Sequence, residues 1–112
     1  MGDAGRRLPE RRAAMLTAYG AALRAVDAGN ATRQALASLG AAATDEPLTV
    51  IAIGKAAVPM ARAVMEMIPH RVLGGVAVDA VGGDPIGPIT VQRGDHPYPS
   101  EGSLAAGAAV AE

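Results

Sequence analysis

The sequence contains no cysteine, tryptophan or phenylalanine, and Tyr19 and Tyr98 are its only aromatic residues. Without cysteine the chain has no disulfide, no thiol nucleophile and no thiolate metal site. Net charge is also small: 10 basic and 11 acidic residues give −1, whereas a nucleic-acid surface needs a strong basic excess. No stretch approaches about 18 uninterrupted apolar residues. We therefore expect no nucleic-acid partner and no membrane span, and a cytoplasmic location is the default.

Small aliphatic side chains dominate what is present. Half of the residues are hydrophobic, and alanine alone supplies 26 of the 112. This content favours a folded chain, since disordered chains have fewer aliphatic residues and more net charge. A chain of 112 residues can form at most one domain, and alanine gives that domain a thin core. We therefore expect residues 1–112 to be part of a larger protein.

The first third of the chain is patterned for two helices. An alanine-rich run over residues 9–27 has apolar residues at helical period, and Pro9 is expected in its first turn. Asn30 is placed to cap a second helix over residues 31–39, and Gly40 is placed to end it.

The remaining two thirds mix strands and helices. The patterns predict strands over residues 48–53, 73–81 and 89–92, and helices over residues 56–68 and from about 101, where Ser100 is a candidate cap. The first strand is a continuous β-branched run, which is typical of a strand covered on both faces of a parallel sheet. The order α-α-β-α-β-β-α predicts an α/β fold, a partial three-layer domain with a Rossmann-like parallel sheet.

Two features of this pattern predict truncation. Three strands make a minimal sheet with open edges, and the last helix reaches Glu112 without a cap. Both features indicate that residues 1–112 form only part of a domain. The open edges would also allow a homo-oligomer.

The most informative site is the junction after the first predicted strand, where Gly54 and Lys55 precede a helix. Ligands of open α/β sheets collect beyond the carboxyl ends of the strands, and helix N-termini attract anions. Lys55 is the only lysine beside nine arginines, and its ammonium suits a phosphate or a carboxylate. The segment is neither a P-loop nor a dinucleotide fingerprint, because Thr49, Ala56 and Val58 occupy positions that those motifs reserve for other residues. We favour an anion site over a surface lysine at a helix start.

A second candidate is the loop Arg93-Gly94-Asp95-His96-Pro97-Tyr98-Pro99-Ser100-Glu101, which follows the third predicted strand. If that strand is parallel to the first, the loop opens on the same rim as Lys55, and His96 could bind an anionic substrate. A histidine that bonds the loop's own backbone is an equal interpretation. Asp95 is expected to serve the turn rather than to act as a base. The two histidines are far apart and no carboxylates are paired with them, so we predict no metal site.

These two segments resemble the N-terminal part of the glycerate 2-kinase family whose members end in a MOFRL domain. The stretch Val50-Ile51-Ala52-Ile53-Gly54-Lys55-Ala56-Ala57, followed by Met60-Ala61, resembles the family signature GKAA…MA. The stretch Gly94-Asp95-His96-Pro97-Tyr98-Pro99-Ser100-Glu101 resembles its GHPxPDE loop, with Asp95 inserted and Ser100 in place of the aspartate. Members are two-domain α/β enzymes of several hundred residues, so the resemblance implies that this chain covers part of the first domain.

The resemblance implies a kinase that transfers the γ-phosphoryl group of ATP to D-glycerate with Mg²⁺ and forms 2-phosphoglycerate. It implies that Lys55 is catalytic and that Gly54, Lys55 and His96 contact the substrate, while the other catalytic and metal-binding residues lie downstream. Residues 1–112 alone would then be inactive. Two alternatives stay open. One is a non-catalytic sugar-phosphate-binding module similar to sugar isomerase domains, although these usually follow the lysine with serine or threonine. The other is an assembly segment that acts through an exposed sheet edge.

Overall fold

The structure, a computed structural model, describes residues 3–112, with side chains from residue 7 onward. Its elements follow the order expected from the sequence, with two added 3₁₀ turns. They are α1 Asp3–Ala25, α2 Ala28–Ser38, η1 Ala41–Ala43, β1 Leu48–Ile53, α3 Ala57–Met67, η2 Pro69–Arg71, β2 Val72–Asp79, β3 Ile89–Arg93 and α4 Glu101–Ala111. The chain is therefore a mixed α/β protein, as predicted.

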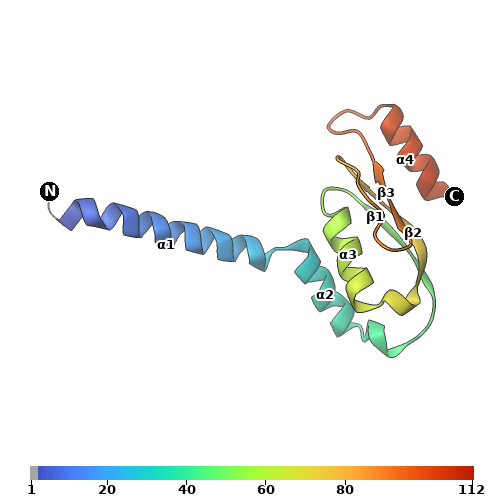
Figure 1. The fold of residues 1–112 in the computed structure, drawn as a ribbon, viewed down its shortest axis with the longest axis horizontal. Coiled ribbons are helices and arrows are strands. Elements are labelled where there is room, and N and C mark those ends of the chain that lie inside the picture. Colours follow the sequence, from blue (N-terminus) through green and yellow to red (C-terminus); the bar gives the residue numbers. More distant parts are fainter. Residues whose placement is uncertain (1–2) are drawn as a thin grey trace.

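The three strands form one parallel sheet with β2 in the centre (Figure 1). Residues 50–53 of β1 pair with residues 75–78 of β2, and residues 75–79 pair with β3. Helix α3 connects β1 to β2, whereas β2 reaches β3 through a loop without a helix. Because the strands are parallel and in register, all three end at one edge of the sheet.

Helices lie on both faces of the sheet, which gives the three layers that the sequence predicts. Ala77 of β2 packs in a cluster with residues of α3, whereas its neighbours Val76 and Val78 pack against Ala106 of α4. Successive side chains of a strand point to opposite faces, so α3 and α4 must cover opposite faces of β2. Helix α2 packs against α3, outside the sheet (Figure 1). The arrangement is that of a partial Rossmann-like domain.

The start of α1 differs from the expectation. The helix begins at Asp3, not at residue 9, so Pro9 lies inside it rather than in its first turn. Proline lacks an N–H and therefore removes one intrahelical hydrogen bond. The leucine, arginine and alanine residues around it are strong helix formers, which favours continuation of the helix across this position.

The start of α2 also differs. It begins at Ala28, and its cap is Asp27, whose carboxylate accepts the N–H of Asn30 at 2.8 Å. Asn30, the expected cap, is already helical. Gly29 lies inside this helix and is buried. A Cβ at Gly29 would lie 3.5 Å from the carbonyl oxygen of Pro59. This is ordinary van der Waals contact, and the closer atoms belong to the side chains of Asp27 and Arg33, at 3.1 and 3.2 Å.

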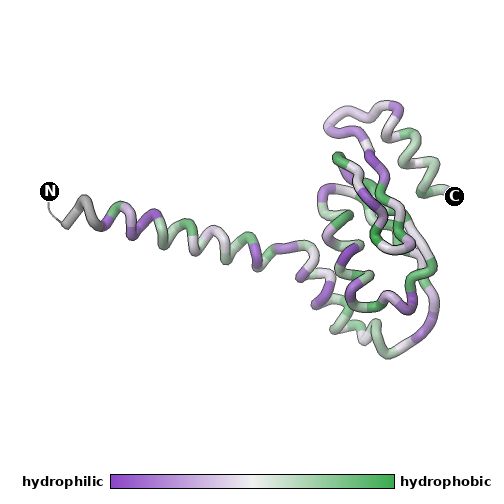
Figure 2. Tube along the Cα trace, in the orientation of Figure 1, coloured by the Kyte–Doolittle hydropathy of each residue, from purple (hydrophilic) through white to green (hydrophobic). Residues whose placement is uncertain are grey.

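The sheet is not covered on both faces along its whole width, contrary to the expectation for β1. Burial alternates along this strand, and Ile51 and Ile53 are 57% and 68% exposed. The reason is that α4 packs on β2 and β3. Helix α1 projects away from the sheet (Figure 1), so its apolar residues Met15 and Tyr19 are exposed. Apolar and polar residues are mixed along this helix (Figure 2). Both surfaces are uncovered within the part of the chain that the structure describes.

Candidate functional site

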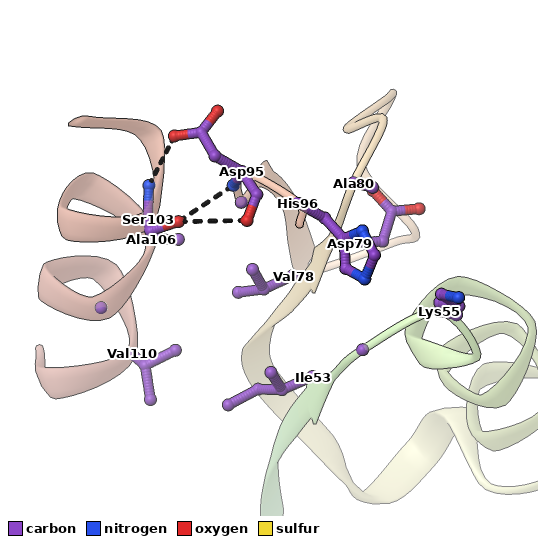
Figure 3. Close-up of a pocket in the computed structure, with 13 residues that line it drawn as sticks. Ile53, Lys55, Val78, Asp79, Ala80, Asp95, His96, Ser103, Ala106 and Val110 are labelled. Carbon is purple, nitrogen blue, oxygen red and sulfur yellow. Dashed lines mark hydrogen bonds between the residues drawn. The ribbon is translucent and has the colours of Figure 1, made fainter. Parts of the chain in front are cut away.

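A hollow of about 390 Å³ lies beyond the carboxyl ends of the three strands (Figure 3). Gly54 and Lys55 line it behind β1, Asp79 lines it at the end of β2, and Asp95 and His96 line it behind β3. The wall toward α4 is mostly apolar, and Ile53, Val78, Ala106 and Val110 contribute to it. Polar residues that lie at the ends of three different strands therefore share one hollow with an apolar wall.

The turn after β1 is built to present backbone N–H groups. Gly54 has a φ of 118°, in a region that side chains rarely adopt, so the turn needs glycine here. Its N–H donates to the carbonyl oxygen of Val78 at 2.9 Å, and its own carbonyl oxygen accepts the N–H of Ala57 at 3.1 Å.

The N–H groups of Lys55 and Ala56 have no acceptor among the described residues. They point from the N-terminus of α3, where the helix dipole also favours negative charge. The exposed ammonium of Lys55 adds a positive charge at the same place. Free N–H groups and a positive charge are features that bind anions in proteins, and an anion site at Gly54 and Lys55 stays a prediction.

His96 lies on the other side of the same hollow. The sequence placed the loop after β3 on the rim of Lys55 only if β1 and β3 are parallel. The two strands are parallel, and the loop lies at that rim. Figure 3 shows the imidazole on the side of the loop that faces Asp79 and Lys55. His96 is exposed and makes no hydrogen bond among the described residues. The geometry therefore leaves its ring nitrogens available to a ligand and gives no support to a histidine that only braces its own loop.

Asp95 faces α4 instead. Its carboxylate accepts the backbone N–H of Ser103 at 3.1 Å and the hydroxyl of Ser100. The hydrogen bond from Ser100 is the main reason why the pKa of Asp95 lies below its ordinary value, with smaller contributions from the N–H groups of Ser103 and Gly102. Ser100 occupies the cap position of α4 but makes no capping bond of its own. Asp95 caps the helix in its place, because the serine hydroxyl is donated to this carboxylate.

Asp79 and Ser103 also line the hollow, and neither was predicted from the sequence. The predicted second strand ran to residue 81, so Asp79 was hidden inside it. The strand in fact ends at Asp79, whose carboxylate accepts the N–H groups of Val81 and Gly82 at 3.0 and 2.6 Å. An aspartate near the end of a valine-rich parallel strand was the signal that could have located it, since such strands end at the ligand-binding edge.

Among the described residues, no three histidine, aspartate or glutamate side chains are placed to hold a metal ion. No described helix is both long and apolar enough to cross a membrane.

No curated protein and no solved structure matches the chain. A family model described as a domain of unknown function, DUF4147, matches residues 14–112. This match includes the second half of α1, the whole sheet and every residue of the hollow. The chain therefore belongs to the DUF4147 family.

Proposed function

We propose that this chain supplies the Lys55 side of the active site of an ATP-dependent kinase that phosphorylates D-glycerate to 2-phosphoglycerate. The main support is that Lys55 and His96, which belong to the two motifs that resemble glycerate 2-kinases, line one hollow. Two strands and a helix separate these motifs in the chain. Both motifs lie at the edge where ligands of parallel α/β sheets bind, so one small molecule could contact both.

Lys55 has the central role in this proposal. In the reaction, the C2 hydroxyl oxygen of D-glycerate bonds to the γ-phosphorus, the bond to the bridging oxygen breaks, and ADP leaves with that electron pair. The hydroxyl proton is released. The Lys55 ammonium holds the transferring phosphoryl group or the glycerate carboxylate and stabilises the charge that develops. The free N–H groups of Lys55 and Ala56 lie beside it.

Gly54 and His96 bind substrate in this scheme. A Cβ at Gly54 would point into open space, so the missing side chain leaves the backbone accessible to a phosphate or carboxylate oxygen. His96 donates a hydrogen bond from its imidazole to the anionic substrate. Because both residues lie around the same hollow, they can contact one small molecule together.

ATP, as its magnesium complex, supplies the γ-phosphoryl group in the cytoplasm. The described residues include no group of three histidine, aspartate or glutamate side chains that could hold a metal ion, and the proposal assigns no Mg²⁺ ligand to this chain. Lys55 is the only lysine or arginine among the residues that line the hollow. Phosphoryl transfer uses several positive groups around the phosphates. In this proposal the further positive groups come from outside residues 1–112, and residues 1–112 alone are inactive.

The test is ADP release from ATP, Mg²⁺ and D-glycerate by the full-length product of the natural gene, with Lys55→Ala as the variant. We expect Lys55→Ala to lower kcat roughly 10²–10³-fold, as expected for removal of one group that stabilises transition-state charge. Arg62→Ala is the matched control, because Arg62 is an exposed cation of α3 that does not line the hollow.

Two results would contradict the proposal. One is the absence of glycerate-dependent turnover in a folded, monodisperse full-length protein. The other is equal activity of Lys55→Ala and Arg62→Ala. Binding of a phosphorylated sugar without turnover would instead identify a sugar-phosphate-binding module.

A further inference from the structure

We propose that Asp95 is a positioning residue that fixes the β3–α4 loop to α4 and thereby holds His96 toward Lys55. This inference rests on the proposed function, because it assigns a role within the same site. It concerns a residue that the glycerate 2-kinase loop pattern GHPxPDE does not contain, since Asp95 stands between its glycine and its histidine.

Asp95 contacts α4 through its backbone as well as its side chain. Its N–H donates to the Ser103 hydroxyl oxygen at 3.0 Å, and its carbonyl oxygen accepts from that hydroxyl at 3.4 Å. Its carboxylate accepts the N–H of Ser103 and the hydroxyl of Ser100. One residue is thus held at three points on the first turn of a single helix, which leaves it little freedom to rotate.

Glycines on both sides make this position tight. A Cβ at Gly102 would lie 2.6 Å from Oδ2 of Asp95, so the carboxylate rests directly on the α4 backbone. On the other side, the N–H of Gly94 donates to the carbonyl oxygen of Asp79 at 2.7 Å. The chain is therefore anchored to β2 at residue 94 and to α4 at residue 95, immediately before His96.

The two neighbouring side chains point in opposite directions. Figure 3 shows the Asp95 carboxylate directed to α4, and the His96 imidazole on the side of Asp79 and Lys55. Among the described residues His96 has no hydrogen bond that would hold it there. The side of the loop on which the His96 side chain leaves the backbone therefore follows from the backbone direction at Asp95.

The same contacts argue against a chemical role for the Asp95 carboxylate. Its Oδ2 atom is already occupied by Ser100 and Ser103, and it is turned away from Lys55. It also neutralises the N-terminus of α4, whereas the N-terminus of α3 beside Lys55 keeps free N–H groups. An incoming anion is thus directed to α3.

Three variants of the full-length protein test this role. Asp95→Ala removes the acceptor, and Gly102→Ala displaces the carboxylate while improving the helix propensity of α4. For both we expect kcat/KM with D-glycerate to fall roughly 10- to 100-fold, as for misplacement of a substrate-binding group. Asp95→Asn keeps an oxygen that can accept the same bonds, so it should retain activity within about threefold. Asp84→Ala and Gly20→Ala are the controls, since neither residue lines the hollow.

A second measurement does not depend on turnover. The imidazole NMR signals of His96, assigned with His96→Gln, should shift in Asp95→Ala and in Gly102→Ala. Those of His70, which lies at η2, should stay unchanged. A loss of global stability alone would not move one histidine and spare the other. Because this readout needs no glycerate, failure of the proposed kinase activity remains distinguishable from failure of the positioning role.

The possible results are separable. Loss of activity in Asp95→Asn equal to that in Asp95→Ala would overturn the inference, because it would show that the charge itself is needed. Unchanged His96 signals in the folded Gly102→Ala variant would also overturn it. If Asp95→Ala does not fold, Gly102→Ala and Asp95→Asn still decide the question.

Discussion

Gly75→Ala should destabilise the pairing between β1 and β2. Gly75 pairs with Val50, and a Cβ at Gly75 would lie 2.1 Å from the carbonyl oxygen of Val50. Real Cβ contacts are essentially never shorter than 3.0 Å, so the strands must separate locally by about 0.9 Å. A ladder hydrogen bond of about 2.9 Å that is stretched by this amount is lost. Each such bond contributes roughly 0.5–1.5 kcal/mol.

We therefore expect the free energy of unfolding to fall by about 1–3 kcal/mol, the range found for other overpacked sites. Thermal unfolding followed by circular dichroism should show a Tm lower by roughly 5–15 °C. Gly74→Ala is the matched control, because it lies next to Gly75 on β2 and its Cβ would meet nothing closer than 3.8 Å. Equal Tm values for the two variants would refute the reasoning.

Three further predictions follow from the packing and the charges. Ile89→Ala removes a side chain that is fully buried between the sheet and α3, so urea unfolding should show a loss of about 2–5 kcal/mol, and a loss below 1 kcal/mol would contradict the assigned core. Glu66→Gln breaks an exposed ion pair with Arg33 at 2.6 Å between α2 and α3, and we expect at most about 1 kcal/mol, decreasing with added salt. The pKa of Asp95 is lowered in the folded chain, so its stabilising effect is complete above its ordinary value of 3.8 and is lost as the pH falls through the lower folded value. Asp95→Asn should remove that part of the acid dependence in denaturation curves recorded below about pH 4.

The sequence was sufficient where a local pattern has one structural solution. The β-branched run over residues 48–53 coincides with β1, and the strand-end glycine and lysine lie where a parallel sheet must place them. Gly40 follows the end of α2 and has a left-handed φ of 63°, as expected for a glycine that ends a helix. These features depend on neighbouring residues and on the direction of the strands, and both can be inferred from sequence.

Features that depend on packing between distant segments could not be predicted. The burial of Gly29 is one example, because α3, which packs against α2, follows only after β1 in the chain. Asp95 could be assigned to the turn, but its capping of α4 depends on how the loop folds back on Ser103. The exposed face of β1 could not be predicted either, since a continuous apolar run does not show whether a helix covers each face of the strand.

The relation between Lys55 and His96 depends on strand register as much as on the two motifs. Ile53 pairs with Val78, and Val78 pairs with Gln92, so the residues that follow β1 and β3 emerge at the same level of the sheet. A slip of one residue would turn every side chain of β1 to the other face, and a slip of two would move Lys55 by about 6.6 Å along the strand. The bare backbone of Gly75 against Val50 lets β1 approach β2 closely in the present register. A substitution there should thus impair ligand binding at Lys55 in protein that is still folded, although Gly75 lines no part of the hollow.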